Sequence, residues 1–350
     1  MKLSRKRGLV LAFVVMLVVA FIVGGCTSGK DTAEPAQEQE SKAEAPKEVL
    51  NLTFATTMED TGIDRELTQK FKQRLEELSG GTMTVTLYMS GQMGSEREAL
   101  EQLKLGELDL GYNVVQSDLY YPEYNVTILP FLFPDMETIE EFMAGPIGDK
   151  IKDAARTKGG VIPLGIHGYG PRWTTSNVPF RNAEELKGLK IRMPNMPPWI
   201  KIWKSMGANP TPIAAPEIVT ALKTGTVDAQ ENFLTNIYGR QMWEYQKYLI
   251  ATKHVNLFQT WLVSEKTWNK LSSEQRQILQ KAIDDAIAYV KPKIDEMNEE
   301  FVRKCEENGM EIIYPDRESL MEAAQPAIKE IIENDLAPEA YEEALKVINQ

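Results

Sequence analysis

Cysteine and histidine are scarce in this sequence of 350 residues, which contains two of each. Cys26 and Cys305 are too few to form a cysteine metal cluster. His167 and His254 are far apart in the sequence, and neither has a Cys, Asp or Glu at a metal-ligand spacing. We therefore interpret both histidines as structural or peripheral, and we expect no metal site and no cofactor.

The common enzyme motifs are also missing. The segment "GIHGYGPRW" contains Gly168 and Gly170, but Trp173 stands where a dinucleotide-binding loop needs its third glycine. There is no phosphate-binding P-loop and no G-x-S-x-G nucleophile elbow. The sequence therefore predicts a protein that is not an enzyme.

Positive charge is in deficit, since 39 basic residues face 51 acidic ones and the formal net charge is -12. Nucleic acid binding needs a basic face, so this charge excludes a nucleic acid partner. A small anionic ligand is still compatible with it, because the field inside a pocket can oppose the net charge. The length and the hydrophobic content of 43% predict a globular protein of about two domains.

The longest apolar run lies near the N-terminus, from Leu9 to Val23, and follows four basic residues. It is short for a membrane span and has the layout of a secretory signal. It leads to "VGGC", which resembles the bacterial lipoprotein signal, where cleavage precedes a lipid-modified cysteine. Residues 1–25 are therefore predicted to be a signal peptide and Cys26 the lipidation site. The alternative, an uncleaved anchor helix, leaves the protein on the same side of the membrane.

Residues 27–48 contain no large apolar side chain and are rich in Glu, Lys, Ala and Pro. Such a segment cannot bury enough surface to offset its ordering entropy. We predict that residues 26–48 are a lipidated cysteine and a flexible tether, which holds a folded part beginning near Val49 outside the cytoplasm. Lipidation would leave Cys305 as the remaining free thiol, so no intramolecular disulfide is expected.

Strand and helix patterns alternate along the folded part, which is typical of an open parallel sheet with helices on both faces. Ser95 and Glu98 have the spacing of a capping box at the start of a helix. The alternation occurs again later in the chain, so the architecture is expected twice. The predicted strands are 49–56 and 82–89, the predicted helices are 64–79 and 95–105, and the alternation resumes at 159–170 and 173–250.

Residues 272–309 carry one apolar stripe at helical spacing. A helix of this length, at about 1.5 Å per residue, runs roughly 50 Å and exceeds one small domain. Pro292 lies in the middle and predicts a kink, because proline removes a backbone hydrogen bond. These patterns predict a two-lobed α/β fold in which each lobe is a sheet flanked by helices and a long kinked helix spans both lobes.

The stretch "LKGLKIRMPN" places an arginine in an ordinary strand pattern. Ile191 and Met193 alternate onto one face and leave Arg192 on the other, before Pro194 ends the strand. On these residues alone, Arg192 is either a solvated surface residue or part of a site.

Polar residues follow or end several predicted strands: Arg172, Arg192, Asn195 and Asn232. In open α/β sheets, ligands bind in the crevice at the carboxyl ends of the strands. Arginine matches a carboxylate bidentately, and asparagine adds a donor and an acceptor. This set contains neither a nucleophile nor an acid–base pair, so it indicates an anion-binding site.

Five segments, in order, resemble the solute-binding protein of TRAP transporters (the DctP-type family), which are ATP-independent carriers for organic acids. The resemblance runs from about Val49 to beyond Leu279. The segments are "SGQMGSEREALEQLKLGELDL", "LPFLFPD", "EELKGLKIRMPN", "MGANPTPIAAPEIVTALKTGTVDAQEN" and "WEYQKYL".

The resemblance implies a periplasmic-binding-protein-like fold whose lobes close over a carboxylate clamped by the arginine of a "K-[IL]-R" strand, here Arg192. It implies lobe I for 49–169 with about 258–297, and lobe II for 170–257 with about 298–345. The implied binding residues are Arg172, Arg192, Asn195 and Asn232, and also Thr57 and Asn113, which occupy positions that line the cleft in relatives.

Two positions depart from the family pattern. Phe233 follows Asn232 where the family often has proline, and Ala215 stands where an aromatic residue is common. Ala215 would leave extra room beside the ligand, and Phe233 can fill it again.

The resemblance implies a function in transport. The protein would capture an organic acid outside the cytoplasm, anchored to the cell membrane through Cys26, and deliver it to an ion-gradient-driven permease. The alternative is a sensor that presents the bound carboxylate to a receptor kinase, and the sequence leaves both partners open.

Overall fold

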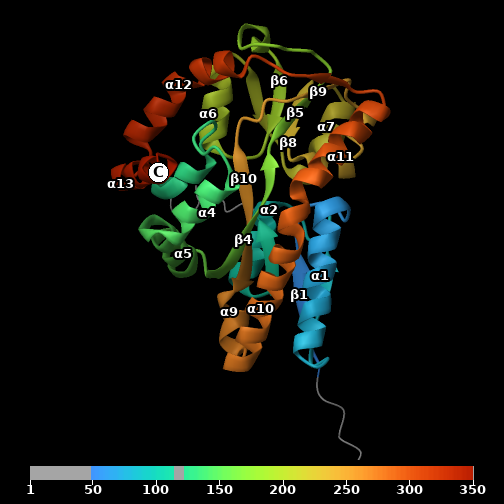
Figure 1. The fold of residues 1–350 in the computed structure, drawn as a ribbon, viewed down its shortest axis with the longest axis vertical. Coiled ribbons are helices and arrows are strands. Elements are labelled where there is room, and N and C mark those ends of the chain that lie inside the picture. The colour runs from blue at the N-terminus through green and yellow to red at the C-terminus, as the bar shows by residue number, and fades with distance from the viewer. Residues whose placement is uncertain (1–48, 114–121, 350) are drawn as a thin grey trace, which may run out of the picture. The chain divides into compact units, whose positions relative to one another are not determined.

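Residues 49–113 and 122–349 are described by a computed structural model of the protein, and they contain two β-sheets (Figure 1). The first sheet has the strand order β2-β1-β3-β10-β4, and the second has the order β11-β9-β5-β8-β6-β7. The first comprises β1 (Leu50–Ala55), β2 (Met83–Tyr88), β3 (Leu110–Asn113), β4 (Val161–Pro171) and β10 (Asn256–Ser264). The second comprises β5 (Trp173–Ser176), β6 (Lys190–Met193), β7 (Asn209–Pro212), β8 (Ala229–Asn232), β9 (Tyr248–Ile250) and β11 (Glu311–Ile313). The predicted α/β class with two helix-flanked sheets is confirmed.

Both sheets are mixed, so the expectation of parallel sheets is wrong in part. β1 is parallel to β2 and β3, whereas β10 is antiparallel to both of its neighbours, β3 and β4. In the second sheet, β5 is antiparallel to β8 and β9. β10 is antiparallel to its neighbours because the chain comes back from the second sheet at this point. It therefore runs through the first sheet in the direction opposite to β3 and β4.

Two of the crossings between the sheets are adjacent to each other. β4 of the first sheet ends at Pro171, and β5 of the second begins at Trp173. The return crossing lies between β9 and β10, where Asn256 pairs with Pro171 and the amide of Arg172 donates to the carbonyl oxygen of Val255 at 2.9 Å. Two neighbouring crossings of this kind are suited to act as a hinge. The lobe boundaries expected near them, at residues 169/170 and 257/258, stay a prediction.

The first two helices begin close to the expected positions. α1 (Gly62–Leu78) buries Leu67, Phe71 and Leu75 completely on the first sheet. α2 (Glu96–Leu105) begins with the predicted capping box, because Ser95 accepts from the amide of Glu98 and the Glu98 carboxylate accepts from the amide of Ser95.

The long helix near the C-terminus is interrupted where proline predicts a kink. It consists of α10 (Ser273–Val290), one 3-10 turn η5 (Lys291–Lys293) that contains Pro292, and α11 (Ile294–Glu307). α10 packs beside α1, α11 contacts α8 (Leu234–Gly239), and β11 then joins the second sheet (Figure 1). The kinked helix therefore carries the chain from one sheet to the other.

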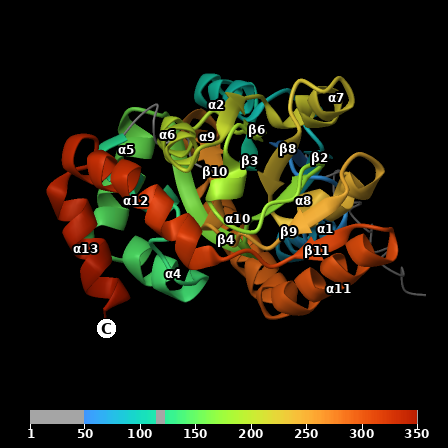
Figure 2. The same ribbon diagram turned by 90° about the horizontal axis from the view of Figure 1, so that it is seen from above.

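The remaining helices cover the flanks of the sheets. α13, which the predicted boundaries assign to lobe II, packs against α4 and α5 (Figure 2). Their bounds are α4 (Met136–Ala144), α5 (Pro146–Thr157), α6 (Pro197–Ser205), α7 (Ile218–Lys223), α9 (Glu265–Lys270), α12 (Arg317–Asn334) and α13 (Pro338–Ile348). The 3-10 turns are η1 (Pro122–Ile128), η2 (Glu184–Leu186), η3 (Ala215–Glu217) and η4 (Met242–Glu244).

The predicted signal peptide, Cys26 and the tether lie outside the described residues. Within residues 49–113 and 122–349, no helix combines the length and the apolar character that a membrane span requires.

Candidate ligand-binding site

A small cavity lies between the two sheets and collects most of the predicted binding residues. Thr57 reaches it from the end of β1, Arg192 from β6, and Asn232 from the end of β8. Arg172, at the crossing between the sheets, lines it as well. The cavity has a volume of only about 30 Å³, so side chains leave little free space in it.

A larger outer cavity, of about 350 Å³, shares Arg192, Glu96 and Ala215 with the inner one. Asn195 is exposed and lines this outer cavity, not the inner one. Arg192 therefore lines both spaces, and Asn195 shares the outer one with Arg192 but not with Thr57, Arg172 or Asn232.

Arg192 is buried, although it shares a strand with the exposed Lys190. Its side chain lies opposite the fully buried Ile191 and is only 2% exposed. Its Nε donates to the carbonyl oxygen of Ile213 at 2.7 Å. Among the described residues Arg192 makes no ion pair, and burial lowers its pKa to about 10, which leaves it cationic at neutral pH. Arg192 is therefore not a solvated surface residue.

Arg172, in contrast, has its own counter-charge within the chain. Its Nε and Nη2 donate to the two carboxylate oxygens of Glu231 at 2.5 and 3.0 Å, and Glu231 is fully buried. Nε2 of His254 lies 3.2 Å from the same carboxylate, and Thr252 lies 3.0 Å from the other ring nitrogen. Burial acts to raise the pKa of Glu231, but Arg172 and His254 outweigh it and lower that pKa. Burial lowers the pKa of His254, so its neutral ring donates to Glu231.

Glu231 is a site residue that the sequence analysis missed, although it stands in the quoted "QEN" motif. The sequence does contain a sign of its role, because Glu231 lies between two other polar residues in one predicted strand. In the structure Gln230, Glu231 and Asn232 are all buried. Its partner Arg172 is far away in the sequence, which is why strand patterns alone did not pair them.

Phe233, one of the departures from the family pattern, lines the inner cavity. The Arg172 guanidinium lies 4.5 Å from its ring centroid, within cation–π distance. The ring centroid of Tyr169 lies 4.6 Å from that of Phe233. Phe233 therefore contacts both Arg172 and Tyr169.

Asn232 is held by its neighbours. Its Oδ1 accepts from the Nδ2 of Asn236 at 2.9 Å and from the amide of Phe233 at 3.0 Å. The hydroxyl of Thr57 donates to Glu96 at 3.2 Å, so Glu96 is a second polar residue of this cavity that the sequence analysis missed. Asn113 is the last residue of β3, opposite Thr260, and its side chain lies outside the described part of the structure.

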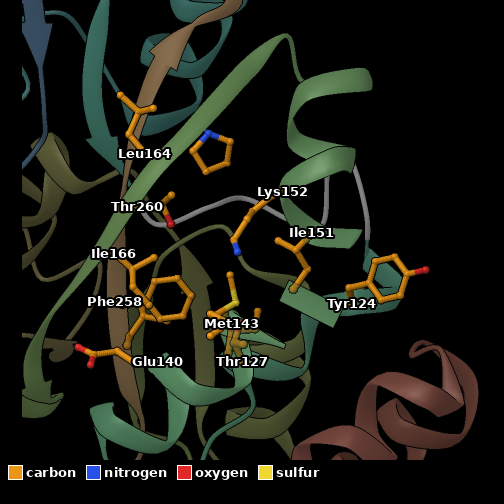
Figure 3. A pocket seen from close by; sticks show the side chains of 15 residues that line it. Tyr124, Thr127, Glu140, Met143, Ile151, Lys152, Leu164, Ile166, Phe258 and Thr260 are labelled. Carbon is orange, nitrogen blue, oxygen red and sulfur yellow. The ribbon is translucent and has the colours of Figure 1, made fainter. Parts of the chain in front are cut away.

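A third cavity, of about 420 Å³, lies on the other face of β10 (Figure 3). Phe258 and Thr260 face it, whereas Gln259 between them faces the inner cavity. Its walls are mostly apolar, and Lys152, a described lining residue, is paired with Asp149 at 3.1 Å. No arginine is among the residues seen to line it, so this cavity does not match the predicted anion site.

Two sheets joined by adjacent crossings, with buried arginines in the cleft between them, are the architecture that this chain shares with bacterial solute-binding proteins. Residues 54–335 match the model of the DctP family, described as "Bacterial extracellular solute-binding protein, family 7". The chain belongs to this family, as the resemblance predicted.

Similar proteins include the sialic acid-binding periplasmic protein SiaP of Vibrio cholerae, which is 35% identical over 261 residues, 74% of this chain and 81% of the relative. A TRAP solute-binding protein of Roseobacter denitrificans with bound L-galactonate has a TM-score of 0.80 and 27% identity. The alignment covers 86% of this chain and 99% of that one. The sugar acid-binding protein DctPAm of Advenella mimigardefordensis, in complex with galactonate, has a TM-score of 0.82 and 25% identity, and the alignment covers 86% and 98%. All three relatives are named as proteins that bind a solute.

Proposed function

We propose that this protein binds a hydroxylated monocarboxylic acid, with the carboxylate at Arg192, and delivers it to the membrane subunits of a TRAP transporter. The observation that carries the proposal is the buried guanidinium of Arg192, which forms no ion pair among the described residues and feels the carboxylates of Glu231 and Glu96 only from a distance. A buried charge is unfavourable unless it is paired, and Arg fits a carboxylate bidentately.

The balance of charges supports one carboxylate rather than two. Glu231 neutralises Arg172, so Arg192 is the guanidinium that is left for an anion in the inner cavity. Glu96 lies between the inner and outer cavities, where a longer ligand would extend. A second carboxylate would meet this negative charge and be repelled.

Two buried acceptors support a ligand that carries hydroxyl groups. Oε1 of Gln259 and Oδ1 of Asn236 are buried, and neither has a hydrogen-bond partner among the described residues. Both residues line the inner cavity. A buried acceptor without a donor is destabilising by about 1–3 kcal/mol, so ligand hydroxyls that donate to these oxygens would add affinity. The relatives that bind galactonate agree with this class.

The size of the inner cavity supports an opening motion. A volume of about 30 Å³ holds roughly two water molecules, which is far less than an organic acid needs. The two sheets would therefore separate as lobes about their paired crossings to admit the ligand and close over it afterwards. Ligand binding would shift this equilibrium towards the closed form, which the permease would recognise.

The membrane anchor belongs to the same proposal. The resemblance of "VGGC" to a lipoprotein signal supports lipidation of Cys26 and cleavage of the bond between Gly25 and Cys26. The binding protein would then remain close to the membrane subunits that receive its ligand. Mass spectrometry of the mature protein tests this anchor, and an unmodified N-terminal Cys26 would contradict it.

Calorimetry with galactonate, erythronate, succinate and the neutral sugar galactose tests the ligand class. We expect a hydroxylated monoacid to bind, galactose not to bind, succinate to bind at least about ten-fold more weakly, and added chelator to have no effect. Binding of galactose in preference to the acids, or loss of acid binding with chelator, would contradict the proposal. Uptake by membranes that contain the TRAP subunits, with and without this protein, tests delivery.

A further inference from the structure

Met58 lies on the wall of the inner cavity, beside two side-chain amides. It follows β1 of the first sheet, is 2% exposed and lines the cavity. Its backbone amide donates to the hydroxyl of Thr56 at 3.2 Å, and its carbonyl oxygen accepts from the amide of Ser90 at 2.8 Å. The Met58 side chain therefore starts from a fixed backbone, although methionine itself is a flexible residue.

The thioether sulfur of Met58 accepts hydrogen bonds from both amides. Nδ2 of Asn236 lies 3.3 Å from the sulfur, and Nε2 of Gln259 lies 3.6 Å from it. Both residues are buried and line the same cavity. The last torsion of such a side chain is roughly two-fold, so the hydrogen-bond partners decide which way round the amide lies. Sulfur accepts and does not donate, so it favours the orientation in which the NH2 groups face Met58.

The two amides depend on this sulfur to different degrees. The NH2 group of Asn236 also donates to Oδ1 of Asn232 at 2.9 Å, so two acceptors hold it. For the NH2 group of Gln259, the sulfur of Met58 is the one acceptor found in the described part of the chain. With Nε2 turned to the sulfur, Oε1 of Gln259 is left without a hydrogen-bond donor among the described residues. Met58 therefore controls the orientation of Gln259 more than that of Asn236.

We propose that Met58 is a positioning residue that makes the site selective for ligand hydroxyl groups. It holds the amide of Gln259, and together with Asn232 that of Asn236, so that both offer an oxygen as acceptor. A ligand hydroxyl can donate to these oxygens. A ligand without hydroxyls leaves them buried and unpaired, and a site of this kind rejects it. The proposal rests on the proposed function and adds the residue that orients its two acceptors.

Met58→Leu tests the proposal, because leucine has a similar size and no acceptor. Calorimetry measures the affinities for galactonate and for hexanoate, a monocarboxylic acid of the same chain length without hydroxyls, and weak binding of hexanoate is measured by displacement. We expect the ratio of the two affinities to fall at least about five-fold, because the amide of Gln259 can then turn either way. A mere loss of packing would weaken both acids and leave their ratio unchanged.

Met196→Leu is the matched control. Met196 lines the same cavity and is 4% exposed, but within residues 49–113 and 122–349 no side-chain amide is seen to donate to its sulfur. This variant should keep the affinity ratio of the parent within about two-fold, because exchange of methionine for leucine conserves the volume. A Met58→Leu protein with the same ratio as the parent and the control would overturn the proposal.

A measurement without ligand tests the contact itself. Met58 and Gln259 both belong to segments of the first sheet, so their contact does not depend on the position of the second sheet. In protein with isotope-labelled methionine methyl groups, we expect a nuclear Overhauser effect between the methyl group of Met58 and the side-chain amide protons of Gln259. These amide signals are assigned by their loss in Gln259→Glu.

Absence of this effect in the parent protein would overturn the proposal, whether or not Met58→Leu folds. The two measurements also separate this inference from the proposed function. If the parent binds no acid of the panel, the proposed ligand class is wrong, and the ligand-free spectrum still decides whether Met58 orients Gln259.

Discussion

Arg172 and Arg192 line the same inner cavity and differ in the source of their counter-charge. Arg172 is paired with the buried Glu231, whereas Arg192 has no ion pair among the described residues. The paired arginine is part of the folded framework, and the unpaired one is the proposed partner of the ligand carboxylate. Sequence motifs alone do not distinguish these two roles, because both arginines sit at strand ends.

The largest expected effect comes from removing the internal counter-charge. Glu231→Gln leaves Arg172 buried without a carboxylate, and removing one partner of a buried ion pair costs about 3–5 kcal/mol. We expect the free energy of unfolding, measured by urea denaturation, to fall by this amount. Glu77→Gln, which breaks an exposed ion pair with Arg74, is the control and should change it by less than about 1 kcal/mol. Equal stability of the two variants would show that Arg172 does not depend on Glu231.

Removing the unpaired arginine should affect binding and spare the fold. In Arg192→Ala the ligand carboxylate is buried without its partner, which costs about 2–5 kcal/mol. Affinity should therefore fall between about thirty-fold and a few thousand-fold. Arg192→Lys should lose much of it too, because an ammonium group lacks the two-pronged geometry. Calorimetry measures the affinity of each variant for the acid. An Arg192→Ala protein that binds within about three-fold of the parent would show that Arg192 does not hold the carboxylate.

Asp64 extends the comparison, because it is a buried carboxylate with no cationic partner in the described part of the chain. Tyr112, Tyr169 and Thr235 donate their hydroxyls to it at 2.7, 2.6 and 3.1 Å, and the negative charge of Glu59 is also close. Burial raises its pKa from 3.8 to about 7, even though the three hydroxyl groups oppose that shift.

The raised pKa of Asp64 predicts a pH dependence of stability. Below pH 3.8 Asp64 is protonated in both the folded and the unfolded chain, so its contribution is fully present there. As the pH rises, the unfolded chain ionises first, and the free energy of unfolding should fall by about 2 kcal/mol between pH 5 and pH 7. Asp64→Asn should lack this part of the slope. An unchanged slope in that variant, measured by urea denaturation at each pH, would contradict the assignment.

The smallest effect is expected from a substitution that changes neither the two arginines nor their partners. Pro292→Ala restores a backbone donor in the turn between α10 and α11, so the two helices can approach one continuous helix. We expect the free energy of unfolding to change by less than about 1 kcal/mol, and the closure on ligand binding to change. Small-angle scattering with and without ligand measures this, and identical closure in both proteins would make the kink incidental.

Local features of the fold could be predicted from the sequence, and long-range pairing could not. The capping box at Ser95 and the break at Pro292 depend on neighbouring residues, and both are present. The direction of β10 depends on where the chain returns from, which strand periodicity does not encode. The first sheet is therefore mixed and not parallel.

The candidate site shows the same limit. Arg172, Arg192, Asn232 and Thr57 come together in the inner cavity, whereas the exposed Asn195 lies in the outer one. Glu231 was overlooked because its importance depends on a partner from a distant strand. Burial of Arg192 on the polar face of β6 also depends on tertiary packing, which strand alternation does not contain.

The central position of β10 in the first sheet has a consequence for the order in which the protein folds. β10 lies between β3 and β4, which end at Asn113 and Pro171, so these strands have no common partner until residues 256–264 are present. Most of the second sheet precedes β10 in the chain. Pairing over such sequence separations is slow, because loop-closure entropy is lost before the contacts form. A nascent chain therefore stays incompletely folded until most of it has been synthesised.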